Sequence, residues 1–306
     1  MRTCPFYGTG TALVTPFTAA GNIDFPALER LVHFQLDGDV EFLVVCGSTG
    51  ESATMTEEED RSVIRFVVEC VQRAKKTVNG QPVRVVAGTG SNNTREAARY
   101  TKCAQELGAD GALVVTPYYN KPPAEGLLAH YKAICDAAPD FPLILYNVPS
   151  RTGSNVSAET QLAIAEACPS VVATKEASGN LDQMMEIIAH APEGFAVLSG
   201  DDSLTLPLIA AGGKGVISVL SNYAPRGLSE LVRAALAGDF VRARALQYTY
   251  LELMKLNFVA PNPIPVKAIL AMMGLIDEHL RLPLVPLNAS HRETLRTALT
   301  RAGLLP

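Results

Sequence analysis

Residues 170–191 read SVVATKEASGNLDQMMEIIAHA, and this stretch contains the unit from which the fold is predicted. It begins with a short apolar run rich in β-branched residues and continues through a polar segment that contains Gly179. It ends in a pattern of apolar residues with helical spacing. A buried strand, a loop and a helix in that order form one βα unit.

The same unit recurs along the chain. Strand-like runs begin near residues 10, 42, 83, 111, 142, 170, 195 and 215, and helical patterns lie between them. Eight apolar strands that alternate with helices predict a parallel sheet closed into a (β/α)₈ TIM barrel. An open, doubly wound sheet is the alternative. However, the first run, GTGTALVT, lacks the GxGxxG pattern of a dinucleotide-binding sheet.

The last quarter of the sequence is helical in pattern without a further strand, from about residue 226 onward. This is more than one barrel helix requires. We therefore expect residues 1–225 to form the barrel and residues 226–306 to form a C-terminal helical segment that closes and extends it. No low-complexity linker separates the two parts.

The composition excludes several classes of function. Of the 306 residues, 48 % are hydrophobic and 19 % charged, which is typical of a soluble globular protein. A net charge of −5 argues against a nucleic-acid partner. The apolar runs are too short to cross a membrane and no secretory signal is visible, so we expect a cytoplasmic protein. Six cysteines without a CxxC pair and five scattered histidines predict neither a metal site nor a cofactor.

Polar or glycine-rich sequence follows nearly every predicted strand. The segments are CGSTGES, AGTGSNN, TPYYNKPP, YNVPSRTG, TKEASGN, SGDDS and SVLSN. In a (β/α)₈ barrel these segments meet at the C-terminal face, where active sites are built. Turn chemistry explains some of the glycine, proline, serine and asparagine. It does not explain hydroxyls, two tyrosines, an arginine and a lysine converging on one rim, so we expect the active site there.

Lys175 follows an apolar strand in VVATKE. A lysine at a strand end can simply extend its ammonium group to solvent. In a barrel mouth, however, apolar walls desolvate the ammonium and lower its pKa from about 10.4 toward neutrality. A neutral amine can attack a ketone and form a Schiff base. Lys214 precedes its strand in GGKGVIS, at the opposite face, and we interpret it as a surface residue.

Three tyrosines accompany this lysine. Tyr146 ends the run PLILY, where it can pack as a strand residue or transfer protons through its phenol. Tyr118 and Tyr119 follow a strand in TPYYN, and at least one of them is expected to serve as a hydrophobic lid.

Hydroxyl groups and a guanidinium complete the candidate site. Ser48 and Thr49 lie between glycines in GSTGE, where they can hold a small carboxylate or merely form a turn. Arg151, in NVPSRTG, can capture a substrate carboxylate with two hydrogen bonds or remain an exposed loop cation. Together these groups indicate a class I lyase that acts on a keto acid and an aldehyde.

Eight segments resemble, in order and spacing, the dihydrodipicolinate synthase family of the pyruvate-dependent class I aldolase or N-acetylneuraminate lyase superfamily. They are GSTGES, GTGSNNTRE, TPYYNKP, YNVPSRTG, KEASGN, SGDD, GVISV and RLPLVP, and the resemblance covers about residues 8 to 290. It implies that pyruvate condenses with Lys175 and becomes an enamine. The enamine then attacks L-aspartate-4-semialdehyde and gives 4-hydroxy-tetrahydrodipicolinate, for lysine and diaminopimelate biosynthesis.

The resemblance also implies the catalytic roles. Tyr146 would be the acid–base residue, and Ser48 and Tyr119 would complete a proton relay. The neighbouring subunit supplies this relay tyrosine in the family, which is most often a dimer of dimers, so a homotetramer is expected. The family usually has threonine where this chain has Ser48. Serine keeps the hydroxyl but loses the methyl group that restricts its rotamers.

Substrate binding is implied at four positions. Thr49 would bind the pyruvate carboxylate and Arg151 the semialdehyde carboxylate. Gly200, in SGDD, is a further substrate-binding candidate, and the backbone carbonyl of Ile217 would lie near the lysine.

An effector pocket for L-lysine is implied as well, at Ser52, Ala53, Glu57, Asn92, Glu96 and Tyr118. Sensitive bacterial members often carry histidines at the positions of Glu57 and Asp60. Added acids can attract the ammonium of lysine or repel its carboxylate. The sequence therefore leaves inhibition by lysine open.

Two other functions compete with the synthase. The first is another pyruvate-dependent lyase, such as N-acetylneuraminate lyase or a keto-sugar-acid aldolase. Arg151 favours the synthase, because the sugar-acid aldolases do not usually carry arginine at this position. The second is a non-catalytic barrel that binds a keto acid.

Overall fold

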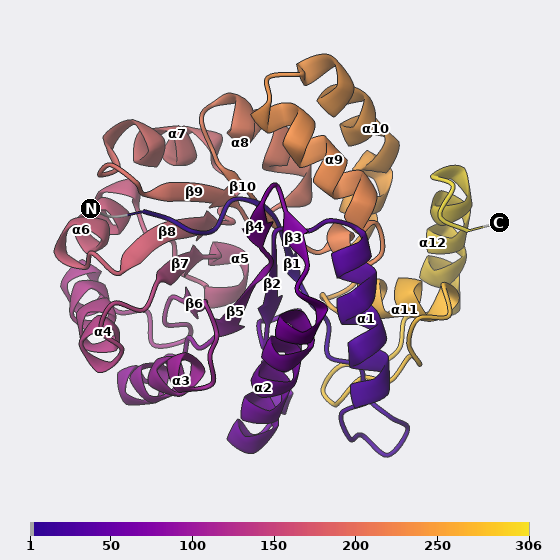
Figure 1. Cartoon of the computed structure of the whole chain (residues 1–306), viewed down its shortest axis with the longest axis horizontal. Coiled ribbons are helices and arrows are strands. Elements are labelled where there is room, and N and C mark those ends of the chain that lie inside the picture. Colours follow the sequence, from indigo (N-terminus) through magenta and orange to yellow (C-terminus); the bar gives the residue numbers. More distant parts are fainter. Residues whose placement is uncertain (1–2, 306) are drawn as a thin grey trace.

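The predicted barrel is confirmed by the computed structural model, which describes residues 3–305 (Figure 1). Eight parallel strands close in the order β1-β10-β9-β8-β7-β6-β5-β2. Their bounds are β1 Gly8–Ala12, β2 Phe42–Val45, β5 Arg84–Gly88, β6 Gly111–Val115, β7 Leu143–Asn147, β8 Val171–Glu176, β9 Ala196–Ser199 and β10 Gly215–Ser218. A separate hairpin, β3 (Thr77–Val78) and β4 (Gln81–Pro82), was not predicted from the sequence.

Helices surround this barrel and continue beyond it (Figure 1). The α-helices are α1 Phe25–Asp37, α2 Glu57–Ala74, α3 Thr94–Glu106, α4 Ala124–Ala137, α5 Pro149–Thr152, α6 Ala158–Ala167, α7 Leu181–His190, α8 Thr205–Ala210, α9 Pro225–Leu236, α10 Phe240–Leu256, α11 Ile264–Met272 and α12 Ala289–Arg301. Three short 3₁₀ turns cover Ser52–Thr54, Asp202–Leu204 and Leu220–Asn222.

Side chains fill the barrel interior. The Phe6 and Phe42 rings lie with their centroids 5.8 Å apart at this inner core, together with Val44, Ile144 and other buried residues. Gly10 faces them from β1, where an added Cβ would lie 2.2 Å from the Phe42 ring. Only glycine leaves room for the ring at this position. The barrel interior below the mouth is therefore filled by closely packed side chains.

Helix boundaries follow the capping residues of the sequence. Thr56 precedes α2, and its hydroxyl accepts a hydrogen bond from the Glu59 amide at 3.3 Å. Glu59 Oε2 accepts one in return from the Thr56 amide at 2.9 Å, which completes a capping box. Gly108 follows α3 with a φ of +84°, the left-handed conformation expected just after a helix. The start of α2 and the end of α3 are thus set by residues with ordinary capping chemistry.

The register of β7 and β8 places the central pair of the site. Tyr146 on β7 pairs with Lys175 on β8. Successive side chains of a strand point to opposite faces, so Lys175 points into the barrel and Glu176 points out toward the helices. Lys214 is exposed immediately before β10, which confirms its interpretation as a surface residue.

The C-terminal helices continue from the barrel without a linker. α9 packs against β1 and β10, α10 packs against α9, and α11 packs against α12. Figure 1 shows α10 beside α9, with α11 and α12 on the right-hand side near the C-terminus. A boundary at residue 225 would thus coincide with the start of a helix that covers the barrel. We propose that the barrel unit extends through α9.

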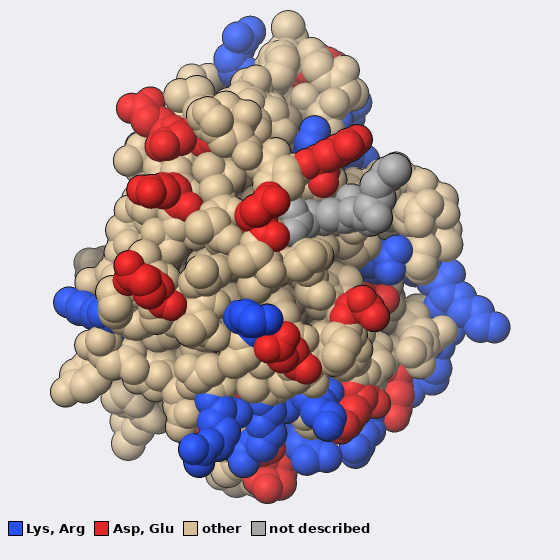
Figure 2. Space-filling view, turned by 90° about the vertical axis from the view of Figure 1, so that its left-hand side faces the viewer, with Lys and Arg blue, Asp and Glu red and all other residues tan. Residues whose placement is uncertain are grey.

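The face shown in Figure 2 carries charges of both signs on a mostly uncharged surface. Basic side chains gather along its lower edge with acidic ones among them. Within residues 3–305, none of the helices has both the length and the hydropathy that crossing a membrane would require.

Candidate active site

Lys175 lies at the centre of the barrel mouth and is only 6 % exposed. Its Nζ atom lies 4.2 Å from the centroid of the Tyr146 ring. Burial lowers the pKa of Lys175 to about 8, the nearby Asp201 carboxylate raises it in opposition, and Arg151 lowers it further. At pH 7 about a tenth of such amines are uncharged and able to act as nucleophiles.

Tyr146 presents its ring to this amine and is buried. Burial raises the pKa of Tyr146 to about 12, and the Arg151 guanidinium acts against that shift. The phenol therefore remains protonated at neutral pH. It can donate a proton to an oxygen that develops negative charge beside the amine.

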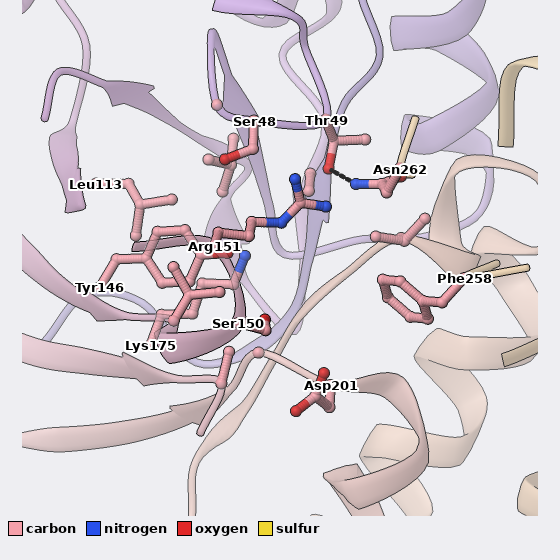
Figure 3. A pocket seen from close by; sticks show the side chains of 17 residues that line it. Ser48, Thr49, Leu113, Tyr146, Ser150, Arg151, Lys175, Asp201, Phe258 and Asn262 are labelled. Carbon is pink, nitrogen blue, oxygen red and sulfur yellow. Dashed lines mark hydrogen bonds between the residues drawn. The ribbon is translucent and has the colours of Figure 1, made fainter. Parts of the chain in front are cut away.

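A cavity of about 60 Å³ opens above these two residues. Figure 3 shows the ammonium group of Lys175 and the guanidinium of Arg151 directed into this space, with Ser48 and Thr49 on the far side. Arg151 comes from α5, the single helical turn after β7, and Gly200 follows β9. Six sequence-predicted residues line the cavity: Ser48, Thr49, Tyr146, Arg151, Lys175 and Gly200.

The loop after β2 supplies the hydroxyl groups. Thr49 is buried, and its Oγ1 accepts a hydrogen bond of 2.8 Å from Nδ2 of Asn262. Ser48 is exposed at the rim. Asn262 donates to the oxygen of the Thr49 hydroxyl, so the proton of that hydroxyl is free to point toward a ligand in the cavity.

Two predicted residues do not line this cavity. Tyr119 is 90 % exposed, and its φ of +70° places it in the left-handed region. Ile217 is fully buried in β10 and belongs to the interior core cluster of the barrel. Within a single chain, Tyr119 therefore lies outside the cavity that Lys175 lines.

Asp201, Phe258 and Asn262 are among the cavity residues that were not selected from the sequence. Asp201 lies in the SGDD segment that follows β9, so its place at a strand end could have identified it. Burial raises the pKa of its carboxyl, while the neighbouring Lys175 lowers it. Phe258 and Asn262 come from the loop between α10 and α11, where no sequence pattern indicates a contact with the barrel mouth.

A second cavity of about 230 Å³ lies beside the loop that follows β2. Its lining includes Ser52, Ala53, Glu57, Asp60, Glu96 and Tyr118. Asn92 is not part of this lining, and its Nδ2 donates to the Tyr118 carbonyl at 3.2 Å. Burial raises the pKa of Asp60 to about 7, and the nearby Glu57 and Glu59 add to the shift. Glu57 is paired with Arg99 at 2.8 Å.

Within residues 3–305, no group of three or more His, Cys, Asp or Glu side chains is arranged to hold a metal ion. The reactive groups are instead a buried amine with a lowered pKa, a protonated phenol against it and a guanidinium at the rim.

A (β/α)₈ barrel with this constellation at its C-terminal face is a lyase of the class I aldolase type. The model of the Dihydrodipicolinate synthetase family matches residues 5–302. The chain therefore belongs to that family, and the resemblance drawn from its motifs is confirmed.

Individual relatives agree over nearly their whole length. The 4-hydroxy-tetrahydrodipicolinate synthase of Koribacter versatilis is 49 % identical over 97 % of this chain and 96 % of its own. The crystal structure of dihydrodipicolinate synthase from Aquifex aeolicus has a TM-score of 0.93 at 45 % identity, covering 98 % of this chain and 99 % of that one. The enzyme from Cyanidioschyzon merolae, solved with lysine bound, has a TM-score of 0.92 at 44 % identity and the same coverage.

Proposed function

We propose that this protein condenses pyruvate with L-aspartate-4-semialdehyde to give 4-hydroxy-tetrahydrodipicolinate. Its membership of the family supports this reaction. The single observation that carries the proposal is the buried Lys175 amine packed against the Tyr146 ring, in a cavity that Arg151 also lines. We place the reaction in the cytoplasm, since none of the six cysteines forms a disulfide.

The first half of the reaction uses the lowered pKa of Lys175. The neutral amine attacks the keto carbon of pyruvate, and Tyr146 donates a proton to the departing oxygen. Water leaves and an imine forms. Loss of a methyl proton then converts the imine into an enamine, whose terminal carbon is nucleophilic.

The second half forms the carbon–carbon bond. The enamine carbon attacks the aldehyde carbon of the semialdehyde, and the resulting alkoxide takes a proton. The amino group of the added unit then attacks the imine carbon, which closes the ring and releases the Lys175 amine. The two carboxylates need separate sites, and we assign the pyruvate carboxylate to Thr49 and that of the semialdehyde to Arg151. Gly200 and Ile217 are assigned to pyruvate binding around the lysine.

Proton transfer in this scheme runs from Tyr146 through Ser48 to Tyr119 of a neighbouring subunit. The exposure of Tyr119 and its left-handed backbone support this assignment. A non-glycine residue held in that conformation is costly and is often found at functional sites. A dimer of dimers, and thus a homotetramer, is the assembly that we propose.

The second cavity is our candidate for an L-lysine effector site. Its three acids, Glu57, Asp60 and Glu96, suit an ammonium group, and a relative was solved with lysine bound. A titration of synthase activity with L-lysine measures whether this chain responds.

Borohydride trapping tests the central step. Incubation with pyruvate and borohydride should add one reduced pyruvate unit per chain, located at Lys175 by peptide mass analysis. Lys175→Arg should abolish both this adduct and turnover in a coupled assay with aspartate semialdehyde. An unmodified chain, or normal turnover of the arginine variant, would overturn the proposed function.

Arg151→Met separates the synthase from other pyruvate lyases. Loss of a bidentate carboxylate contact should raise the KM for the semialdehyde by about 100-fold, since hydrogen bonds to charged groups contribute about 1.5–3 kcal/mol. Pyruvate should still be trapped at Lys175, with the midpoint of the pH dependence moved up slightly, because Arg151 no longer lowers the pKa of that amine. Efficient cleavage of N-acetylneuraminate by the wild-type protein, with no use of the semialdehyde, would instead favour the aldolase alternative.

A further inference from the structure

The loop that carries Ser48 and Thr49 continues into Glu51, which the C-terminal segment holds through a buried ion pair. Glu51 has a φ of +57°, in the left-handed region. Its carboxylate pairs with Nζ of Lys267 on α11, and the side chains of both residues are fully buried. The pair therefore joins the mouth of the barrel to a helix far along the chain.

Each carboxylate oxygen of Glu51 has a partner in the C-terminal segment. Lys267 contacts Oε1, while the backbone N–H of Arg281 donates to Oε2 at 3.3 Å. The Lys267 ammonium also donates to the His279 carbonyl at 2.9 Å and lies 4.2 Å from the centroid of the Phe17 ring. The ammonium is thus fixed by three different contacts.

Arg281 also binds the segment that follows Glu51. Its guanidinium donates to the carbonyls of Gly21 at 2.6 Å and Thr54 at 2.9 Å. It also pairs with Glu59 at 2.6 Å and lies 4.3 Å from the centroid of the Phe17 ring. The loop is consequently held at Glu51 and again three residues later.

Thr49 lies two residues before Glu51 in a tight turn. The Gly50 amide donates to the Gly47 carbonyl at 3.0 Å, and the Glu51 amide donates to the Ser48 carbonyl at 3.3 Å. A turn this short leaves little freedom between the anchored carboxylate and the Thr49 hydroxyl. A shift of Glu51 would therefore move the groups that face the cavity.

Stability alone is a poor explanation of this pair. Apolar residues of similar size are often as stabilising as a buried ion pair, because both charges lose their hydration. That cost is visible at Lys267, where burial lowers the pKa to about 8 although Glu51 raises it. What a charged pair adds is one fixed geometry, reached through short, directional contacts.

We propose that Glu51 and Lys267 are positioning residues, which hold Thr49 where it receives the carboxylate of pyruvate. The proposal rests on the proposed function for the identity of that keto acid. According to this proposal, α11 contributes to substrate binding through Lys267, although it does not touch the reacting atoms.

Three variants separate positioning from stability: Glu51→Gln, Lys267→Met and the double variant E51Q/K267M. Each single change leaves one buried charge without its partner, so both should lower Tm. The double variant removes both charges and should recover most of that loss. In all three, the KM for pyruvate should rise by about tenfold or more while kcat changes by less than about threefold, since the lost contact positions ground state and transition state alike.

Lys132→Met is the matched control, because Lys132 forms an exposed ion pair with Asp136 on α4. It should leave both Tm and the KM for pyruvate at wild-type values. The pyruvate dependence of borohydride trapping at Lys175 gives the same half-saturation readout without the second substrate. A failure of the semialdehyde assignment therefore leaves this test intact. A double variant with the wild-type KM for pyruvate would overturn the proposal and leave the pair a purely structural role.

Discussion

At the scale of single residues, the pKa of Lys175 depends on opposing neighbours. Burial and Arg151 lower this pKa, whereas the Asp201 carboxylate raises it. Asp201 lines the same cavity, and its carboxylate is drawn beside the open space in Figure 3. The Asp201 carboxylate therefore limits how far burial can lower the pKa of Lys175. It also limits the fraction of neutral amine that can attack pyruvate at neutral pH.

Asp201→Asn removes this opposition. Without the negative charge the ammonium form is less favoured, so the pKa of Lys175 falls and the neutral amine appears at lower pH. The midpoint of the pH dependence of pyruvate trapping, measured between about pH 6 and 9, should move down by about half a unit. Asp182→Asn, an exposed acid at the start of α7, should leave the midpoint unchanged. An upward shift would contradict the assigned sign.

At the scale of secondary structure elements, Glu176 joins two strands and two helices. It points outward from β8 and is fully buried. Its carboxylate accepts hydrogen bonds from Asn147 at 3.0 Å, Gln161 at 2.7 Å and Gln183 at 3.0 Å, and from the Ser178 amide at 2.8 Å. Asn147 belongs to β7, and the two glutamines to α6 and α7. Neutral amides thus satisfy a buried charge directly behind Lys175 and Tyr146.

Glu176→Ala should be strongly destabilising for this reason. The three side-chain amides would lose their shared acceptor in a buried place. We expect the free energy of unfolding in urea to fall by about 2–4 kcal/mol. Glu166→Ala, at an exposed position of α6, should cost less than about 0.5 kcal/mol. A loss below about 1 kcal/mol at Glu176 would show that water or repacking replaces the carboxylate.

The elements themselves could be predicted because their determinants are local. The strand at 171–176 is an apolar run, and α2 begins at a threonine whose capping partner lies three residues later. Lys175, Tyr146 and Arg151 could be grouped because the ends of parallel strands meet on one face of a barrel. The hairpin at 77–82 was missed because each of its strands is only two residues long.

Contacts between distant segments could not be predicted in this way. Asn262 and Thr49 are separated by 213 positions, and no periodicity of either segment indicates that they touch. The same holds for Glu51 and Lys267, whose partnership depends on where the C-terminal helices pack. The sequence therefore predicts most of the polar residues that follow the strands and misses those supplied by the segment after α10.

At the scale of the whole molecule, the loop that follows β6 exposes a large aromatic side chain to solvent. Tyr118 is 40 % exposed and lines the second cavity, whereas Tyr119 beside it is 90 % exposed. Hydrogen bonds stiffen this tip: the Asn120 amide donates to the Tyr118 carbonyl at 2.8 Å, and Asn120 Nδ2 donates to the Asn92 carbonyl at 2.9 Å. An ordered loop with a large exposed aromatic side chain at its tip suits an interface between subunits.

Mixing two inactive variants tests whether this loop completes a neighbour's site. Tyr119→Phe lacks the relay hydroxyl but keeps Lys175, and Lys175→Arg lacks the amine but keeps Tyr119. In a mixed dimer, one site then combines an intact Lys175 with an intact Tyr119 from the other subunit. After dissociation and reassembly at equal amounts, synthase activity should recover to about a quarter of the wild-type value, because half of the dimers are mixed and each has one intact site. If Tyr119 served its own chain, every site in the mixture would lack either the Tyr119 hydroxyl or the Lys175 amine. The activity of the mixture would then not exceed the sum of the activities of the two variants.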